Sequence, residues 1–273
     1  MYIQFTDEGL YEALSDSTIV KIKMGSHLYG CDTESSDLDY LCIYREGISN
    51  ESSYLWEHHP YQYKKNGIDY NFTSLQCFIR NLINGDSPHN FEVLYSKELM
   101  SDGTISWLSK YKEHFMNYNL IRSYLGLAKR DIKDYNHETF NGTKECTPYA
   151  FKKAFNVLRG VEVAKMLMNG KYNNDFISLK SIKMGVVPDS QYVHDLVAVN
   201  ANSMEFLRDL LNDRLKNGSI KKIIDPVVAK KLDDELMSTC TSNRYKWRQL
   251  LYIDYLGIPY NAMESGVNNP RKQ

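Results

Sequence analysis

Two aspartates separated by a single residue, Asp37 and Asp39, are the side chains best placed to do chemistry. They open a predicted strand over residues 37–44, in which side chains alternate between faces, so both carboxylates point the same way, about 7 Å apart along the chain. Neighbouring carboxylates repel each other, and a divalent cation removes that penalty. Mg²⁺, which prefers carboxylate and phosphate oxygens, is the expected cofactor, with Mn²⁺ as a substitute. The alternative to a metal site is a polar turn that leads into the strand, since Ser-Ser-Asp is a common turn sequence.

A Gly-Ser pair upstream of these aspartates has the chemistry of a phosphate site. Gly25 follows a predicted strand over residues 18–24 and lets the backbone come close to a ligand. Ser26 would open a short helix whose free N–H groups and hydroxyl can hold a phosphate. We therefore expect a triphosphate bound there to reach a cation held by Asp37 and Asp39.

A third carboxylate is expected, because two-metal phosphoryl transfer needs a ligand on the metal that activates the attacking hydroxyl. Asp69 is the best candidate: in the predicted strand 67–72 it shares a polar face with Asn71, opposite an apolar face. Three other carboxylates lie near in sequence and remain alternatives: Asp32, Glu34 and Glu92.

Lys152, Asn156 and Arg159 are spaced to share one face of a predicted helix over residues 148–168. Lys152 and Arg159 could neutralise the β- and γ-phosphates of a nucleotide from that face. The alternative is a solvated helix face. The adjacent stripe is apolar and is expected to face the core: Phe151, Phe155 and Leu158.

The order of the predicted elements is strands first and helices afterwards. The remaining expected elements are helices 7–14 and 73–83, a helical turn that leads into a strand over 91–99, and helices 120–135, 190–215 and 226–237. This order predicts an α+β fold, a mixed sheet flanked by helices and followed by an α-helical domain. We expect the catalytic domain to span 1–115 and the helical domain, which binds substrate and nucleotide, to span 116–273.

Charge is unevenly divided along the 273 residues. Residues 1–100 carry 7 Lys/Arg against 15 Asp/Glu, and the rest carry 26 against 19. An acidic first part suits a cation site and a basic second part suits a phosphate-rich substrate, although unpatterned surface charge would look the same. The chain lacks the pattern of a signal peptide or membrane span, and its five cysteines are scattered, so a cytoplasmic location is expected.

The stretch 25–40, GSHLYGCDTESSDLDY, resembles the G-S-x-x-Y-G…S-D-x-D-Y motif of a family of predicted nucleotidyltransferases. This family is a branch of the DNA polymerase β superfamily, occurs in bacteria and large tailed phages, and is associated with RNA repair. Weaker similarities follow at 86–94, 152–159 and 182–185. Asn156 stands where the branch tends to have histidine, which weakens any proton-transfer role there.

The resemblance implies a polymerase β-like catalytic domain that moves a nucleoside monophosphate from a nucleoside triphosphate, ATP among them, to a hydroxyl, with release of pyrophosphate. It implies an RNA acceptor, such as a 3′ end or a tRNA, in the cytoplasm, or in the host cytoplasm for a phage-encoded protein. The alternatives are an enzyme of the same fold that modifies a protein or a small molecule, and a non-catalytic nucleotide- or RNA-binding protein.

The resemblance also assigns roles to residues. The catalytic and metal-binding set is Asp37, Asp39 and Asp69. The nucleotide-binding set is Gly25, Ser26, Gly30, Ser36, Lys152 and Arg159.

Overall fold

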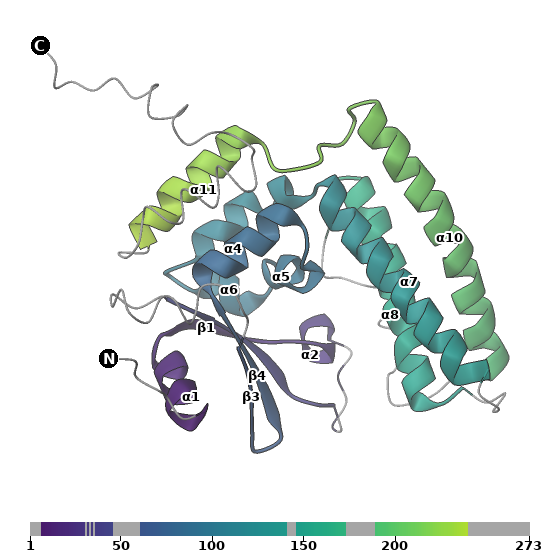
Figure 1. Ribbon diagram of the computed structural model, residues 1–273, viewed down its shortest axis with the longest axis horizontal. Helices are drawn as coiled ribbons and strands as arrows, with labels where there is room; N and C mark the ends of the chain where they lie inside the picture. Colours follow the sequence, from purple (N-terminus) through teal and green to yellow (C-terminus); the bar gives the residue numbers. More distant parts are fainter. Residues whose placement is uncertain are drawn as a thin grey trace, which may run out of the picture.

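The protein is described from a computed structural model, which places residues 7–30, 32, 34, 36–45, 61–140, 146–172 and 189–239. The similarity noted at 182–185 lies outside these residues. Figure 1 shows a small sheet with α1 on one side and α4, α5 and α6 on the other, beside a bundle of longer helices. The predicted α+β architecture is confirmed: a mixed sheet flanked by helices leads into a helical region.

Four strands form one mixed sheet in the order β1-β2-β4-β3. Their bounds are β1 Thr18–Lys23, β2 Asp39–Tyr44, β3 Tyr61–Lys65 and β4 Ile68–Ser74. The pair β2–β4 is parallel, whereas β1–β2 and β3–β4 are antiparallel. The sequence patterns had predicted three of these strands, and β2 begins two residues later than expected.

Strand β3 was not predicted, although the sequence contains a signal for it. Asn66 and Gly67, both with positive φ, join β3 to β4. Asn-Gly is the preferred pair for a two-residue hairpin turn because both positions need this backbone conformation. The hairpin projects beyond the rest of the sheet (Figure 1).

The two faces of the sheet belong to different cores, because side chains alternate along each strand. On β2, Leu41 and Ile43 join the main core beneath the helical layer. Cys42 and Tyr44 face the other way, into a small cluster with Leu14 of α1 (Asp7–Asp16). Tyrosines surround this second cluster.

Short helices follow the sheet: α4 Leu75–Asn84, α5 Pro88–Val93, α6 Lys97–Ser101 and the 3₁₀ segment η1 Ser106–Phe115. Ser74 caps α4 by accepting a hydrogen bond from the Cys77 N–H at 3.1 Å. The strand expected towards Leu99 was wrong. Residues 94–99 are a turn and the start of α6, which Ser96 caps. In so short a stretch the spacing of apolar residues does not distinguish a strand from a helical turn.

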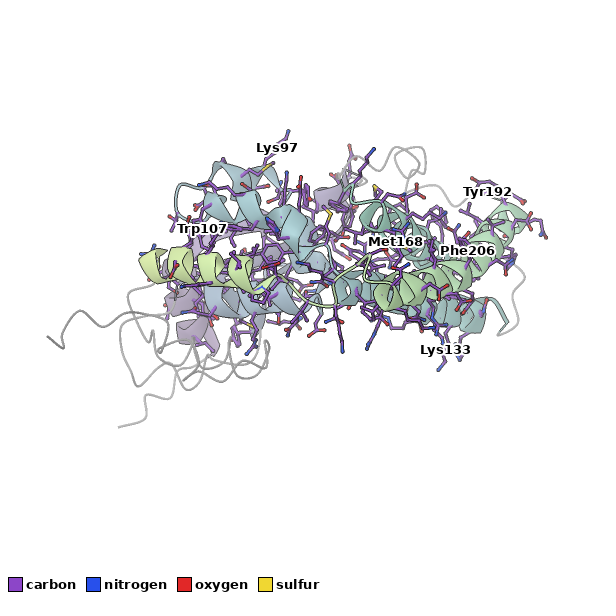
Figure 2. All side chains as sticks on the ribbon, turned by 90° about the horizontal axis from the view of Figure 1, so that it is seen from above. Lys97, Trp107, Lys133, Met168, Tyr192 and Phe206 are labelled. Carbon is purple, nitrogen blue, oxygen red and sulfur yellow. The ribbon has the colours of Figure 1, made fainter. Side chains whose placement is uncertain are left out.

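The helical region consists of α7 Tyr118–Phe140, α8 Pro148–Met168, α10 Ser190–Lys216 and α11 Pro226–Thr239. Helices α7, α8 and α10 pack against one another, and α8 has the predicted bounds. Figure 2 labels Tyr192 and Phe206 on α10, whose rings are exposed. No helix among the described residues combines the length and apolar character that membrane crossing requires.

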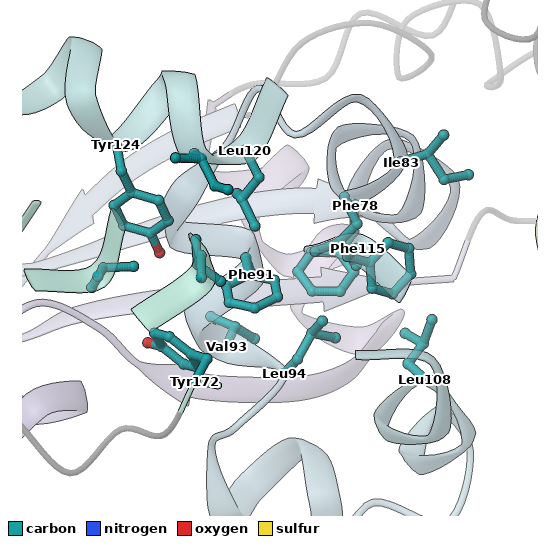
Figure 3. Packing of buried hydrophobic residues seen from close by; sticks show 14 of the residues in the cluster. Phe78, Ile83, Phe91, Val93, Leu94, Leu108, Phe115, Leu120, Tyr124 and Tyr172 are labelled. Atoms are coloured by element: carbon teal, nitrogen blue, oxygen red, sulfur yellow. The ribbon is translucent and has the colours of Figure 1, made fainter. Parts of the chain in front are cut away.

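One main core connects the sheet to the helical region. It includes Ile22 of β1, Phe78 of α4, Tyr124 of α7 and Leu236 of α11. Figure 3 shows its centre, where Phe78 of α4 and Phe91 of α5 lie beside Leu120 and Tyr124 of α7. The division into domains at 115/116 stays a prediction.

Gly85 is expected to tolerate no side chain. It ends α4 with φ +69°, and a Cβ there would lie 2.4 Å from the Leu120 backbone nitrogen. Gly85→Ala should therefore lower the free energy of unfolding by about 2–5 kcal/mol, from backbone strain and overpacking together. Urea denaturation measures this. Gly67→Ala is the matched control, with φ +79° but open space around the Cβ, and should lose only about 1 kcal/mol. Equal losses would contradict the steric account.

Candidate active site

Asp39 and Asp69 lie directly opposite each other on the parallel strands β2 and β4. Neighbouring strands are about 4.8 Å apart, so the two carboxylates share one edge of the sheet. The pKa of Asp39 is raised, first by partial burial and then by the negative charges of Asp69 and Asp37. The predicted third carboxylate thus stands beside the first two, and their repulsion is the electrostatic condition that favours a bound cation.

Main-chain hydrogen bonds fix the ends of the three strands that meet here. The Met24 N–H donates to the Asp39 carbonyl at 2.8 Å, and the Asp69 N–H donates to the Leu38 carbonyl at 3.1 Å. Asp37 precedes β2 and is exposed, whereas Asp39 is partly buried.

Gly25 sits against this carboxylate group. Its backbone has φ 62° and ψ −136°, a conformation that side chains disfavour. A Cβ there would lie 3.6 Å from Asp39 Oδ2, so the loop backbone passes close to the acidic site. Helix α2, Ser26–Tyr29, begins directly afterwards, as predicted, and Gly30 ends it in the left-handed conformation. The loop before α2 and the carboxylates therefore face one space.

Two lysines act on the carboxylates. Lys152 of α8 is exposed and lowers the pKa of Asp39, as does Lys64. Lys64 Nζ lies 3.4 Å from Asp69 Oδ2, in an exposed ion pair. Lys64 belongs to β3, and sequence reasoning missed it because that strand was missed. Lys152 is thus near enough to Asp39 to act on its charge, and its role at the nucleotide phosphates stays a prediction.

Arg159 does not join Lys152 at that site, which corrects the expectation that both face the phosphates. Arg159 is buried, and its Nη1 lies 3.1 Å from both carboxylate oxygens of Glu92 on α5. It also donates to the Tyr29 hydroxyl and packs over the Tyr29 ring, 4.5 Å from its centroid. Arg159 lies about one helical turn beyond Asn156, at the point where α8 contacts Glu92 of α5. The helix face that these residues share is therefore exposed at Lys152 and buried at Arg159.

The interaction of Tyr29, Glu92 and Arg159 joins α2, α5 and α8 in the protein interior. The Tyr29 hydroxyl donates to Glu92 Oε2 at 2.5 Å, and Glu92 is fully buried. Glu92 is therefore no candidate for the third metal ligand, and Asp32 pairs with His27 at 3.1 Å. Because Tyr29 ends the helix that begins at Ser26, this cluster holds the Gly25–Ser26 loop in place.

The buried cluster also predicts how stability depends on pH. Burial raises the pKa of Glu92, but Arg159, His89 and Tyr29 outweigh it and lower that pKa to about 2. A carboxyl group whose pKa is lowered by folding stabilises the fold at pH values above its unfolded-state pKa of 4.5. This stabilisation is lost as the pH falls towards 2. Thermal melts should show a decline over this window. Glu92→Gln should flatten it, whereas Glu98→Gln on the surface of α6 should leave it unchanged. Equal declines in both variants would contradict this account.

The charge and the position of Asp37, Asp39 and Asp69 suit a divalent cation. Within the part of the chain that the structure describes, no three His, Cys, Asp or Glu side chains are gathered as a ready-made metal cage. Asp39 and Asp69 are nonetheless adjacent, and Asp37 is exposed two residues before Asp39. Mg²⁺ is commonly held by one or two carboxylates together with substrate phosphates, so a site completed by nucleotide suits these residues.

A family model for the RNA repair pathway DNA polymerase beta family matches residues 11–234. The chain belongs to this family. The match includes every residue assigned above to the catalytic and nucleotide-binding sets, and it identifies the protein as a nucleotidyltransferase-family enzyme.

A solved structure of a nucleotidyltransferase-like protein from Exiguobacterium sibiricum 255-15 is also similar. It is 14% identical, with coverage of 94% of this chain and 89% of that one, and the TM-score is 0.32. No curated protein matches the sequence significantly.

Proposed function

We propose that this nucleotidyltransferase moves a nucleoside monophosphate from a nucleoside triphosphate, ATP among the candidates, to a hydroxyl of RNA in a Mg²⁺-dependent reaction. The observation that carries the proposal is the in-register pair Asp39 and Asp69 beside the Gly25 loop, where partial burial and then the charge of Asp69 raise the pKa of Asp39. The family's association with RNA repair supports RNA as the acceptor. Mn²⁺ would serve in place of Mg²⁺.

We assign each residue a role in this reaction. Asp37, Asp39 and Asp69 would hold the divalent cations, which supply charge neutralisation for the leaving pyrophosphate and acidify the attacking hydroxyl. The loop at Gly25 and Ser26 would orient the triphosphate, with Gly30 and Ser36 completing the same motif. Lys152 would stabilise the charge that develops on the phosphates.

Arg159 would act indirectly. Through Glu92 and Tyr29 it positions α2, and with it the loop at Ser26.

The bond that forms joins the acceptor oxygen to the α-phosphorus, and the bond that breaks releases pyrophosphate. Because Asp39 must be ionised to bind a cation, transfer should rise with pH through its raised pKa.

Transfer of label from nucleoside triphosphates tests the proposal. Each of the four nucleotides, labelled at the α-phosphate, is incubated with Mg²⁺ and either total RNA or total protein. Label in RNA, lost in Asp37→Asn and Asp39→Asn, is the expected result. Label in protein would favour an enzyme of the same fold with a protein acceptor. No label in any acceptor would contradict the catalytic proposal.

A further inference from the structure

The sheet face opposite the carboxylates carries a row of tyrosines ending in a lysine. Lys23 of β1 pairs with Tyr40 of β2, Tyr40 with Tyr70 of β4, and Tyr70 with Tyr63 of β3. The row therefore crosses all four strands. Its three tyrosines are half-buried and Lys23 is exposed, so the row forms part of the surface.

The rings of this row are arranged for stacking. Tyr40 and Tyr70 stack at 5.7 Å between centroids with 16° between their planes. Lys21, exposed one row away, places its ammonium 3.9 Å from the Tyr40 ring centroid and 4.7 Å from that of Tyr70. This part of the sheet thus already accepts a cation on its aromatic rings.

Helix α1 covers only part of the face. Tyr11 stacks on Tyr63 at 4.7 Å and meets Tyr70 edge-on at 5.3 Å, and Leu14 packs with Cys42 and Tyr44 of β2, so α1 covers β3, β4 and the far half of β2. Glu8 of α1 pairs with Lys65 at 3.0 Å. Among the described residues, no carboxylate forms an ion pair with Lys21 or Lys23. The part of the face around Lys21, Lys23 and Tyr40 is therefore positive and aromatic.

This combination matches one kind of partner. Aromatic rings stack bases, and lysines between them contact the phosphates of a single strand. Bases in a duplex are already stacked on each other, so a surface of this kind favours unpaired RNA.

The position of the row connects it to the carboxylates. Tyr40 and Tyr70 directly follow Asp39 and Asp69 in the sequence, and therefore point to the opposite face at the same end of the sheet. One RNA strand can pass around this end, with its terminal hydroxyl at the carboxylates and the preceding nucleotides on the tyrosine row.

We infer that the face formed by Lys21, Lys23, Tyr40 and Tyr70 binds the single-stranded segment next to the acceptor hydroxyl of RNA. This inference rests on the proposed function, because it assigns a surface to the RNA acceptor. It adds that the enzyme selects unpaired ends, and that stacking on Tyr40 contributes to this selection.

Binding of a short fluorescein-labelled single-stranded RNA, measured by anisotropy, tests the inference. Tyr40→Leu keeps apolar bulk but removes the ring, and should raise the Kd about 5- to 100-fold. Lys23→Gln should raise the Kd and reduce the slope of log Kd against log salt by about 0.7. Tyr192→Leu and Lys216→Gln, exposed positions on α10, are the matched controls and should bind as wild type does.

The same RNA annealed to its complement should bind more weakly to wild type. Wild-type affinity in Tyr40→Leu and Lys23→Gln would overturn the inference, as would losses no larger than in the controls. A failure of the proposed function is separately visible, because wild-type protein would then transfer no label to RNA. If label is transferred and the variants still bind normally, only the assignment of this surface is wrong.

Discussion

Asp39→Asn is expected to reduce nucleotidyl transfer by roughly 10³-fold or more while leaving the metal-free protein at least as stable as wild type. The loss is large because the carboxylate stands between Asp37 and Asp69 and would contact both bound cations. Stability should not fall, because partial burial and then repulsion by Asp69 and Asp37 make the charge of Asp39 unfavourable in the fold, as its raised pKa reflects. The measurements are label transfer and thermal melts in EDTA.

The matched control is Asp209→Asn, an exposed carboxylate on α10. It should leave both transfer and melting unchanged. If Asp39→Asn melted well below wild type without metal, Asp39 would be a structural residue and the electrostatic account would be wrong. Like charges gathered to bind a ligand lower the stability of a protein, so removing one of them can preserve or raise stability while activity is lost.

Arg159→Met is expected to destabilise the protein by about 3–5 kcal/mol. The substitution keeps much of the side-chain volume but leaves the fully buried Glu92 without its positive partner, and an unpaired buried charge is strongly unfavourable. The double variant Glu92→Leu with Arg159→Met removes both charges and should recover part of this loss. Chemical denaturation of both variants measures the difference.

Arg208→Met provides the comparison. Arg208 pairs with Glu205 at 2.8 Å, but both side chains are exposed, so its loss should change stability by less than about 1 kcal/mol. If Arg159→Met kept wild-type stability but lost nucleotide affinity, Arg159 would contact phosphate directly, and the buried ion pair would not be its main role.

Much of the site could be predicted from the sequence because its information is local. The alternation around Asp39 and Asp69 indicated both strands, and the structure places the two residues side by side. Helix α8 has the predicted bounds because Thr147 caps it, Pro148 opens it and its apolar stripe is long.

What was not predicted depends on contacts between distant segments. Tyr29 and Glu92 are 63 residues apart, and no local pattern pairs them with Arg159. A lysine or arginine on a helix face has the same spacing whether that face meets solvent or another helix, so Arg159 was expected in the nucleotide site. The missed strand β3 is different, since Asn66 and Gly67 were a usable hairpin signal.

The central claim is that Asp37, Asp39 and Asp69 hold divalent cations together with the nucleotide. Binding of Mn²⁺, followed by electron paramagnetic resonance in the presence of a non-hydrolysable nucleoside triphosphate, tests it most directly. Wild type and Asp209→Asn should bind Mn²⁺ equally, Asp39→Asn should lose this binding, and Asp69→Asn should weaken it. Unchanged Mn²⁺ binding in Asp39→Asn and Asp69→Asn would contradict the account.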